Sequence, residues 1–205
     1  MLVGIQWSGK WTQARKILEK YGDDFVLFEM GGELRRFIQW DSSEAREAKT
    51  LMDAGHKAPT SAIIKMVELF LSKNIGKRIL MDGVIRSREQ QDAIGQLFGN
   101  FDVLYLDLDV ETAVQRLCGR RIDPVTQETF PASFEWEINP KTGNKLVTRD
   151  DDKEEAIRKR ISWSISDTLP LIDLSKHLGH RVYRIDANQS EGEIFEEVEK
   201  VVLEK

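Results

Sequence analysis

Residues 1–14 read MLVGIQWSGKWTQA. A short apolar run leads into Gly4, and Gly9 and Lys10 then precede a stretch whose apolar residues have helical spacing. This order of strand, glycine-containing loop and helix presents backbone N–H groups and a helix N-terminus to phosphates, with Lys10 placed to reach them. The stretch predicts a phosphate-binding loop at the start of an α/β fold, and an ordinary strand-to-helix turn is the alternative interpretation.

The loop departs from the strict phosphate-binding pattern at two tryptophans. Trp11 follows the lysine directly, where that pattern has Ser or Thr, so Thr12 becomes the candidate hydroxyl ligand for magnesium. Trp7 is bulky in a loop where small residues normally let the backbone approach a ligand.

Five short apolar runs alternate with longer amphipathic stretches. Runs without polar alternation are typical of parallel strands covered on both faces, and the stretches between them are long enough to return as helices. The sequence therefore predicts an α/β fold with a five-stranded parallel sheet and helices on both faces. The predicted strands are Met1–Ile5, Phe25–Glu29, Arg78–Met81, Val103–Leu108 and Val182–Ile185. The predicted helices include Thr12–Tyr21, Glu44–Asp53, Thr60–Lys73, Glu89–Phe98 and Glu191–Leu203.

Two segments interrupt this alternation. Residues 30–59 form a mostly helical excursion between the second and third predicted strands. Residues 121–149 are rich in proline and polar residues, which predicts an ordered, partly β flap. We therefore expect one domain, with a core of residues 1–29, 60–120 and 150–205 that carries both excursions.

Composition excludes several classes of protein. The 205 residues include 30 Lys and Arg against 35 Asp and Glu, for a formal charge of −5, which argues against general binding to nucleic acid or a membrane surface. The single cysteine, Cys118, excludes an intrachain disulfide and a multi-cysteine zinc cluster, and it suits a reducing, cytoplasmic setting. No signal peptide or membrane span is expected. A monomer is the expected state.

Five motifs, in order, resemble those of the adenylate kinases, a family of nucleoside monophosphate kinases with the P-loop NTPase type of fold. They are GIQWSGKWTQA at 4–14, LMDAGHKAP at 51–59, KRILMDGVIRSREQQ at 77–91, RLCGRRIDPVT at 116–126 and TRDDDKEEAIRKR at 148–160. The resemblance covers nearly the whole chain. It implies reversible, Mg²⁺-dependent transfer of the γ-phosphoryl group of ATP to AMP, giving two ADP, with residues 30–59 binding the monophosphate and residues 121–149 acting as a lid.

The resemblance places ATP between the phosphate loop and two arginines. Arg116 is implied to lie against the adenine and Arg120 on the phosphates, and we expect both on one face of a helix because they are four residues apart. The implied ATP-binding residues are Trp7, Ser8, Gly9, Lys10, Trp11, Thr12, Arg116, Arg120, Thr129, Phe130 and Gln189.

The resemblance also implies an AMP site. Arginine forks match phosphate oxygens, so Arg35 and Arg86 would clamp the monophosphate. Gln90 is implied to read adenine, whose donor and acceptor edge a side-chain amide can serve. Met30 and Ile85 depart from the family pattern in this region. The implied AMP-binding residues are Met30, Arg35, His56, Lys57, Ala58, Gly83, Arg86, Gln90, Arg149 and Arg160.

Phosphoryl transfer needs positioning and charge neutralisation, and no general base is required here because the attacking phosphate is already anionic. The resemblance implies that Mg²⁺ is held largely through water by Thr12 and Asp82, since a carboxylate at the carboxyl end of a strand faces the crevice of an open sheet. Arg149 and Arg160 would project the same way if residues 150–159 are helical. The implied catalytic residues are Lys10, Arg86, Arg120, Arg149 and Arg160.

The segment 121–149 has no cysteine pair, so the optional zinc site of the family is not expected. We predict instead that Asp123, Thr126, Asn139 and Thr142 form a hydrogen-bond network across it, and two independent proline turns are the alternative.

Two other functions stay open. The tryptophans of the loop would suit a nucleotide-binding protein that no longer catalyses, and the departures near Met30 would suit another acceptor, CMP, UMP or GMP.

Overall fold

The computed structural model describes residues 1–53, 57–126, 128–132, 134–148 and 153–204, apart from the side chain of residue 160. The strands are β1 (Leu2–Val3), β2 (Phe25–Glu29), β3 (Arg78–Asp82), β4 (Asp102–Asp107), β5 (Arg121–Ile122), β6 (Thr129–Phe130) and β7 (Arg181–Asp186). The helices are α1 (Lys10–Tyr21), α2 (Met30–Phe37), α3 (Ser43–Asp53), α4 (Thr60–Lys73), α5 (Arg88–Phe98), α6 (Val110–Cys118), α7 (Glu154–His177) and α8 (Glu191–Leu203).

Five parallel strands form the main sheet in the order β2-β3-β1-β4-β7, which confirms the predicted fold. β1 lies in the middle, with β3 on one side and β4 on the other. The order of the strands reverses at this point, and open α/β sheets bind ligands beyond the carboxyl ends of strands at such a reversal. The loop that follows β1 therefore stands where a ligand is expected.

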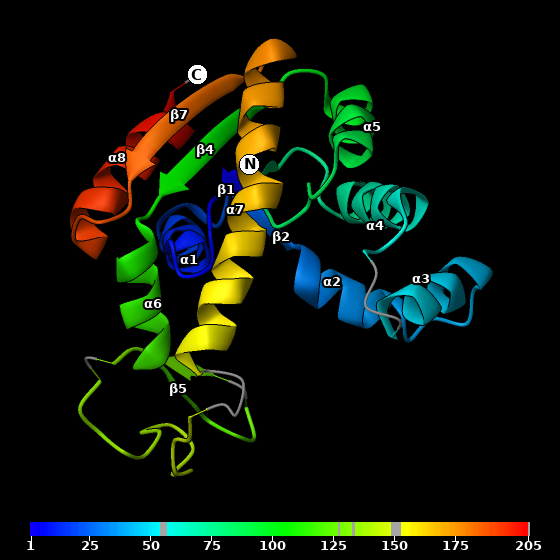
Figure 1. Ribbon diagram of the computed structural model, residues 1–205. Helices are drawn as coiled ribbons and strands as arrows, with labels where there is room; N and C mark the ends of the chain where they lie inside the picture. The colour runs from blue at the N-terminus through cyan, green and yellow to red at the C-terminus, as the bar shows by residue number, and fades with distance from the viewer. Residues whose placement is uncertain (54–56, 127, 133, 149–152, 205) are drawn as a thin grey trace.

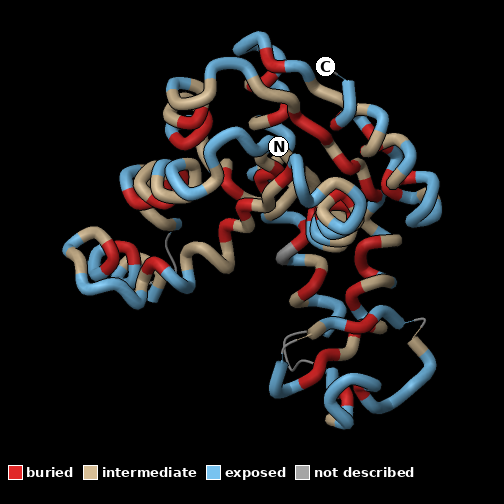
Figure 2. The backbone as a smooth tube through the Cα atoms, turned by 180° about the vertical axis from the view of Figure 1, so that it is seen from behind, coloured by how far each residue is buried: buried red, intermediate tan, exposed pale blue. Residues whose placement is uncertain are grey.

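Helices cover both faces of the sheet (Figure 1). α1 packs against α8, while α5 packs against both α4 and α7. The core consists of two apolar clusters, and the buried residues follow the strands and the inner sides of the helices (Figure 2). Ile17 of α1 and Ile161 of α7 are fully buried in one cluster, and Phe28 of β2 in the other.

The two excursions extend from the sheet in different directions (Figure 1). α2 and α3 make up most of the first, as the helical spacing predicted. In the second, β5 pairs with β6 in antiparallel fashion, and bridges join Ile122 to Val147 and Ile138 to Lys145. This segment is partly β, as its composition indicated.

Two helix boundaries differ from the sequence analysis. α6 ends at Cys118 with Gly119 as its C-cap, so Arg120 lies beyond the helix and does not share a helical face with Arg116, which corrects that expectation. α7 runs to His177, far beyond the stretch 150–159 for which a helix was considered, and it contains Pro170. Residues 150–152, expected at the N-terminus of this helix, lie outside the described residues.

Candidate active site

The phosphate loop between β1 and α1 depends on unusual backbone angles. Gly4 has a φ of 154°, and a Cβ there would lie 2.5 Å from Ser8 Oγ and 2.6 Å from the carbonyl oxygen of Leu106, so only glycine fits. Gly9 has a φ of 88° and is the N-cap of α1. Trp7 also has a positive φ, 64°, which is uncommon for a residue with a side chain.

The ammonium group of Lys10 lies inside this loop. Its Nζ donates to the carbonyl oxygens of Gly4 and Ile5, both at 2.8 Å, and lies 3.4 Å from Ser8 Oγ. Burial lowers the pKa of Lys10, the nearby carboxylate of Asp82 opposes that shift, and the guanidinium of Arg86 adds to it. The cation is thus partly desolvated, and an anion beside it would stabilise its charge.

Two carboxylates stand side by side at the carboxyl ends of β2 and β3, where Glu29 is in register with Asp82. Burial raises the pKa of Asp82, an effect that Lys10 and Arg86 oppose and the charge of Glu29 reinforces. Glu29 is the N-cap of α2, and its carboxylate accepts hydrogen bonds from the backbone N–H groups of Gly31 and Gly32 at 2.8 and 2.7 Å. Asp82 is therefore a half-buried carboxylate whose ionised form a nearby cation would stabilise.

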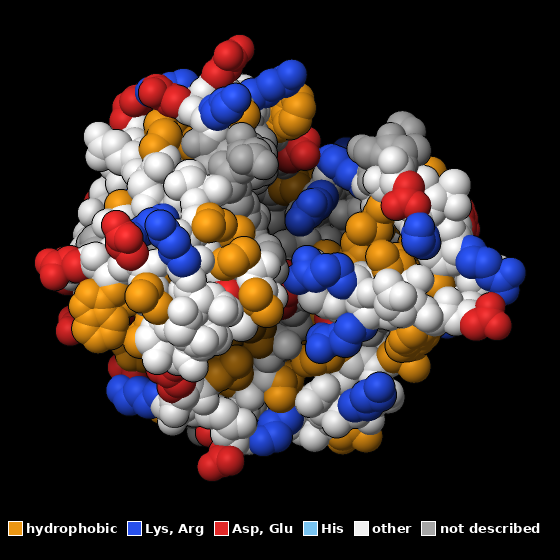
Figure 3. Space-filling model, turned by 90° about the horizontal axis from the view of Figure 1, so that it is seen from below, with side chains coloured by type: hydrophobic (Ala, Val, Ile, Leu, Met, Phe, Trp, Pro, Cys, Tyr) orange, Lys and Arg blue, Asp and Glu red, His pale blue; other side chains and the backbone are white. Residues whose placement is uncertain are grey.

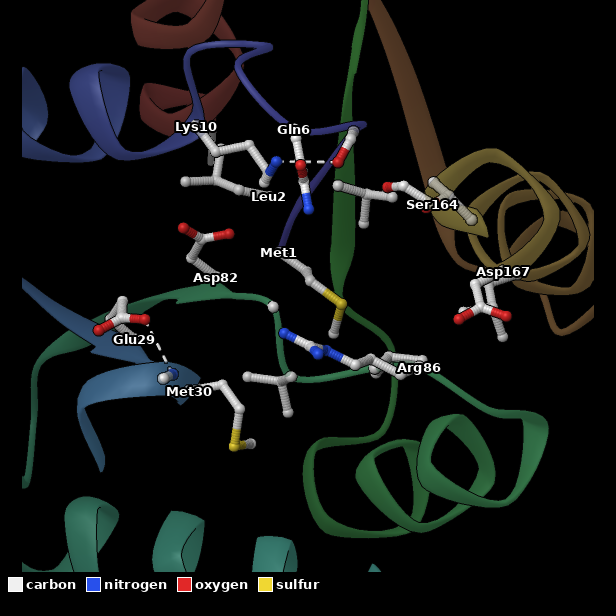
Figure 4. Close-up of a pocket in the computed structure, with 18 of the residues that line it drawn as sticks. Met1, Leu2, Gln6, Lys10, Glu29, Met30, Asp82, Arg86, Ser164 and Asp167 are labelled. Atoms are coloured by element: carbon white, nitrogen blue, oxygen red, sulfur yellow. Dashed lines mark hydrogen bonds between the residues drawn. The ribbon is translucent and has the colours of Figure 1, made fainter. Parts of the chain in front are cut away.

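These groups share one cavity of about 430 Å³, a volume within the usual range for small-molecule sites. Lys10, Asp82 and Arg86 reach it from different elements and point toward its centre (Figure 4). Lys and Arg side chains follow the hollow between the two halves of this face of the molecule (Figure 3). The cavity itself combines the cations Lys10 and Arg86 with the carboxylates of Glu29, Asp82 and Asp167.

Five residues implied by the resemblance line this cavity: Lys10, Met30, Asp82, Gly83 and Arg86. Sequence reasoning missed four of its polar or aromatic neighbours, Gln6, Glu29, Trp163 and Asp167. Glu29 could have been found as the last residue of a predicted strand. Several residues of α7 line the cavity, and their spacing places them on one face of the helix. This pattern could be recognised only if the helix was known to extend past residue 159. The residues are Trp163, Ser164, Asp167, Thr168 and Leu171.

The two arginines assigned to ATP by resemblance both contact the phosphate loop. Arg116 donates from Nη1 to the carbonyl oxygen of Trp7 and from Nη2 to that of Ala187, each at 3.2 Å. Arg120 is buried, and its Cζ lies 5.8 Å from the centre of the Trp7 ring. The end of α6 is thereby joined to the loop after β1.

On the acceptor side, contacts converge on the backbone of Arg86. Its N–H donates to Gln90 Oε1 at 2.8 Å, and its carbonyl oxygen accepts from Lys57 Nζ at 2.8 Å. Lys57 also pairs with Asp167 of α7 at 3.1 Å. Arg35 lies farther out, with its guanidinium 3.8 Å from the Glu29 carboxylate and largely exposed.

The other implied residues are spread around this centre. Thr12 lies in the first turn of α1, next to Trp11, whose exposed ring faces Arg15. Thr129 and Phe130 form β6, and Gln189 donates to Glu197 at 2.8 Å. Ala58 lies just before α4, and Arg160 lies within α7. His56, Arg149 and the side chain of Arg160 lie outside the described part of the structure.

A hydrogen-bond network ties the segment 121–148 together around Asp123, whose side chain is fully buried. It accepts from Asn139 Nδ2 at 2.8 Å, Thr142 Oγ1 at 2.6 Å and Asn144 Nδ2 at 3.1 Å, which confirms two of the predicted pairings. Thr126 contributes its backbone N–H rather than its hydroxyl, a correction to the prediction. The sequence analysis also missed Asn144.

Within the described ranges, no group of three or more His, Cys, Asp or Glu side chains could hold a metal ion. No helix in the part of the chain that the structure describes is both long and apolar enough to cross a bilayer.

Comparisons with known proteins agree with this arrangement. A family model described as "Adenylate kinase" matches residues 2–180. The chain is 32% identical to a protein named adenylate kinase from Chloroherpeton thalassium, over 98% of this chain and 96% of that protein. It is 30% identical to one of the same name from Francisella philomiragia, over 97% and 96%, and 28% identical to one from Oceanobacillus iheyensis, over 100% and 99%. The chain with Lys10, Asp82 and Arg86 around one cavity belongs to the adenylate kinase family, whose members are phosphotransferases.

Proposed function

We propose that this enzyme transfers the γ-phosphoryl group of ATP to AMP, reversibly and with Mg²⁺, giving two ADP. The observation that carries the proposal is the meeting of Lys10, from the phosphate loop, and Arg86, from the motif after β3, in one cavity. A donor phosphate chain on the first and an acceptor phosphate on the second would be held close together, and such positioning supplies much of the catalysis in phosphoryl transfer.

Lys10 and Arg86 would bind phosphate differently. The Lys10 ammonium now donates to the carbonyls of Gly4 and Ile5, and phosphate oxygens are stronger acceptors for the same donors. The Arg86 guanidinium is a fixed fork that suits two oxygens of one phosphate. Gln90 and Lys57 both hold the backbone of Arg86 by hydrogen bonds. If Gln90 reads the acceptor base, this contact would fix the distance between the base and the Arg86 guanidinium that binds the acceptor phosphate.

The residues present fit a magnesium ion. Asp82 offers a carboxylate at the carboxyl end of β3, and burial raises its pKa, so a divalent cation nearby would favour its ionised form. We propose that Asp82, with Thr12, holds Mg²⁺ largely through water. When bound, the ion would neutralise phosphate charge and orient the polyphosphate.

The remaining roles are proposals from the resemblance. Arg120, Arg149 and Arg160 would join Lys10 and Arg86 in stabilising the transferring charge, while residues 30–59 and 121–149 close over the substrates and exclude water. We also propose that the enzyme acts as a monomer in the cytoplasm, where a reducing setting suits its single cysteine.

A coupled assay of ADP formation tests the function. The purified protein is given ATP and Mg²⁺ with AMP, CMP, UMP or GMP in turn, and ADP should form fastest with AMP. Preference for another monophosphate would overturn the acceptor assignment alone. Absence of turnover with all four would overturn the proposed reaction and favour a nucleotide-binding protein without catalysis.

A pair of variants tests the acceptor clamp. Replacing Arg86 with alanine should lower kcat/KM for AMP by about 10²- to 10³-fold, because a charge-stabilising donor is lost, with little change in Tm. The matched control is Arg88→Ala, since the exposed Arg88 side chain on α5 has, among the residues that the structure describes, only a long ion pair with Asp92, at 3.8 Å. Similar kinetics for the two variants would show that Arg86 does not clamp the substrate.

A further inference from the structure

Lys57 joins two parts of the acceptor side that are far apart in the chain. Its ammonium donates to the carbonyl oxygen of Arg86 at 2.8 Å and pairs with the carboxylate of Asp167, on α7, at 3.1 Å. We propose that Asp167 and Lys57 are positioning residues that hold the backbone of Arg86, so that its guanidinium meets the phosphate of a nucleoside monophosphate. The inference rests on the proposed role of Arg86 as the acceptor clamp.

The backbone that carries Arg86 has no regular structure of its own. Residues 84–86 lie between β3 and α5 and belong to neither a strand nor a helix. Gly83, just before them, has a φ of 71°, and the Arg86 guanidinium folds back over it, because a Cβ on Gly83 would lie 3.7 Å from Arg86 Nη2. The direction of the guanidinium therefore depends on the side chains that hold this loop.

Two side chains hold the main chain at Arg86. The buried Gln90 of α5 accepts from its N–H at 2.8 Å. Lys57 holds the carbonyl oxygen, but its long side chain is half-exposed and would sample several rotamers by itself. Asp167 restricts these rotamers, because it gives the ammonium a second acceptor on a different element. The bridge through Lys57 thus ties the Arg86 loop to α7.

The bridge also neutralises a charge that would oppose binding. Asp167 and Arg86 both line the cavity, and they face it from different elements (Figure 4). An unpaired carboxylate there would repel an acceptor phosphate, whereas a carboxylate paired with an ammonium contributes little net charge. Asp167 therefore favours acceptor binding only together with Lys57.

The excursion of residues 30–59 contains a matched ion pair for comparison. Arg46 pairs with Asp41 at 3.1 Å and also donates to a carbonyl oxygen, that of Ser42, at 3.3 Å. Both charged side chains are exposed. Among the described residues, neither lines the cavity, and their polar contacts stay within residues 41–46. Variants of this pair therefore serve as controls.

A double-mutant cycle tests the inference. Lys57→Met keeps the length of the side chain but removes the ammonium. It should raise KM for AMP by about five- to tenfold, while KM for ATP at saturating AMP stays near the parent value. Asp167→Asn should raise KM for AMP by about two- to threefold, as expected for a half-exposed pair. In the Lys57→Met background the same change should lower KM for AMP, because it then removes an unpaired negative charge from the cavity.

The sign of the Asp167 effect separates positioning from direct binding. If Lys57 bound the acceptor phosphate itself, Asp167→Asn would release the ammonium and lower KM for AMP in the parent enzyme, which would overturn the inference. An equal factor in both backgrounds would overturn it as well. Arg46→Met and Asp41→Asn should leave KM for AMP unchanged. A rise in Arg46→Met as large as that in Lys57→Met would mean a general effect of lost charge pairs and would also count against the inference.

A measurement without nucleotide separates this inference from the proposed function. The Arg86 amide donates to Gln90, so hydrogen exchange at that amide reports how firmly the loop is held. Exchange should speed up in Lys57→Met, speed up less in Asp167→Asn and stay unchanged in Arg46→Met. This result in a protein without turnover would support the positioning of Arg86 while the proposed reaction falls. Unchanged exchange in Lys57→Met would overturn the inference whatever the activity.

Discussion

Asp82 shows how a functional side chain can weaken the fold that carries it. Its half-buried carboxylate lies at the end of β3, where it lines the cavity next to the carboxylate of Glu29 on the neighbouring strand. Burial raises its pKa, and Lys10 and Arg86 only partly offset that effect. A group whose pKa is higher in the folded protein favours folding while it is protonated, below its unfolded pKa, and this contribution is lost as the pH rises.

We therefore predict that Asp82→Asn raises Tm at neutral pH and lowers turnover. The amide cannot ionise, so it avoids the cost of a buried charge, but it is a poor partner for Mg²⁺. The gain in Tm should shrink as the pH falls through the range where Asp82 becomes protonated. Calorimetry across pH 7 to about 4 measures it. The fully exposed Asp41 provides the control Asp41→Asn, with no expected gain, and a lower Tm for Asp82→Asn at pH 7 would contradict the prediction.

At the scale of single residues, the sequence predicted the positions of side chains that lie within local motifs. Lys10 stands at a loop-to-helix junction and Asp82 at a strand end, so both could be placed from neighbouring residues alone. The ring contact between Trp7 and Arg120 joins residues far apart in the chain, and no local pattern indicated it.

At the scale of the element, the 121–148 segment is organised by one buried carboxylate. Burial opposes ionisation of Asp123, but hydrogen bonds from Thr142, Thr126 and Val125 outweigh it and hold its pKa well below the usual range. Glu128 extends the network by accepting from Asn139 at 3.2 Å and from Lys141 at 2.7 Å. A network centred on a carboxylate of low pKa should keep its ionised form through mildly acidic conditions.

Replacing Asp123 with alanine should loosen this segment while the core stays folded. The donors of Asn139 and Thr142 would lose their shared acceptor, and buried donors without partners are costly. Hydrogen exchange should then speed up at the amides of Ile122 and Val147, which pair with each other across the segment. Glu135→Ala, on the exposed surface of the same segment, is the control. Unchanged protection in Asp123→Ala would show that the network does not organise the segment.

The helices differ in how well sequence alone defined them. Thr60–Lys73 was predicted with the observed bounds, because its apolar residues repeat with helical spacing. α7 was mostly missed because Pro170 interrupts the pattern and because its inner face lines the cavity with polar residues such as Asp167. A helix that serves both core and site does not show a clean apolar stripe.

For the molecule as a whole, the distribution of charge matters more for nucleotide binding than the net charge of −5. Residues 187–205 contain six Glu against two Lys, so most of the net negative charge lies at the C-terminal end, on and around α8. Lys and Arg side chains gather instead along the hollow of the face shown in Figure 3. An acidic protein can thus place cationic side chains where they attract nucleotides.

We predict that KM for ATP and AMP rises with ionic strength, while kcat changes less. Raising KCl from about 0.01 M to about 0.1 M shortens the Debye length from about 30 Å to about 10 Å, which screens long-range attraction of the nucleotides. Steady-state kinetics in a salt series measures the effect. Glu196→Gln, at an exposed position of α8, should leave the salt dependence unchanged. A KM independent of salt would show that the Lys and Arg side chains along the hollow do not aid binding by long-range attraction.

The sequence by itself determined the five strands of the parallel sheet, most of the helices between them and the motifs that carry Lys10, Asp82 and Arg86. These follow from patterns a few residues long, in which apolar spacing, glycines and helix starts act locally. Only the tertiary structure decided which side chains meet: Glu29 beside Asp82, Trp7 against Arg120, and Asp167 of α7 with Lys57 across the acceptor side. Such contacts arise where parallel strands bring distant loops to one edge of the sheet, and their geometry depends on the packing of the whole chain.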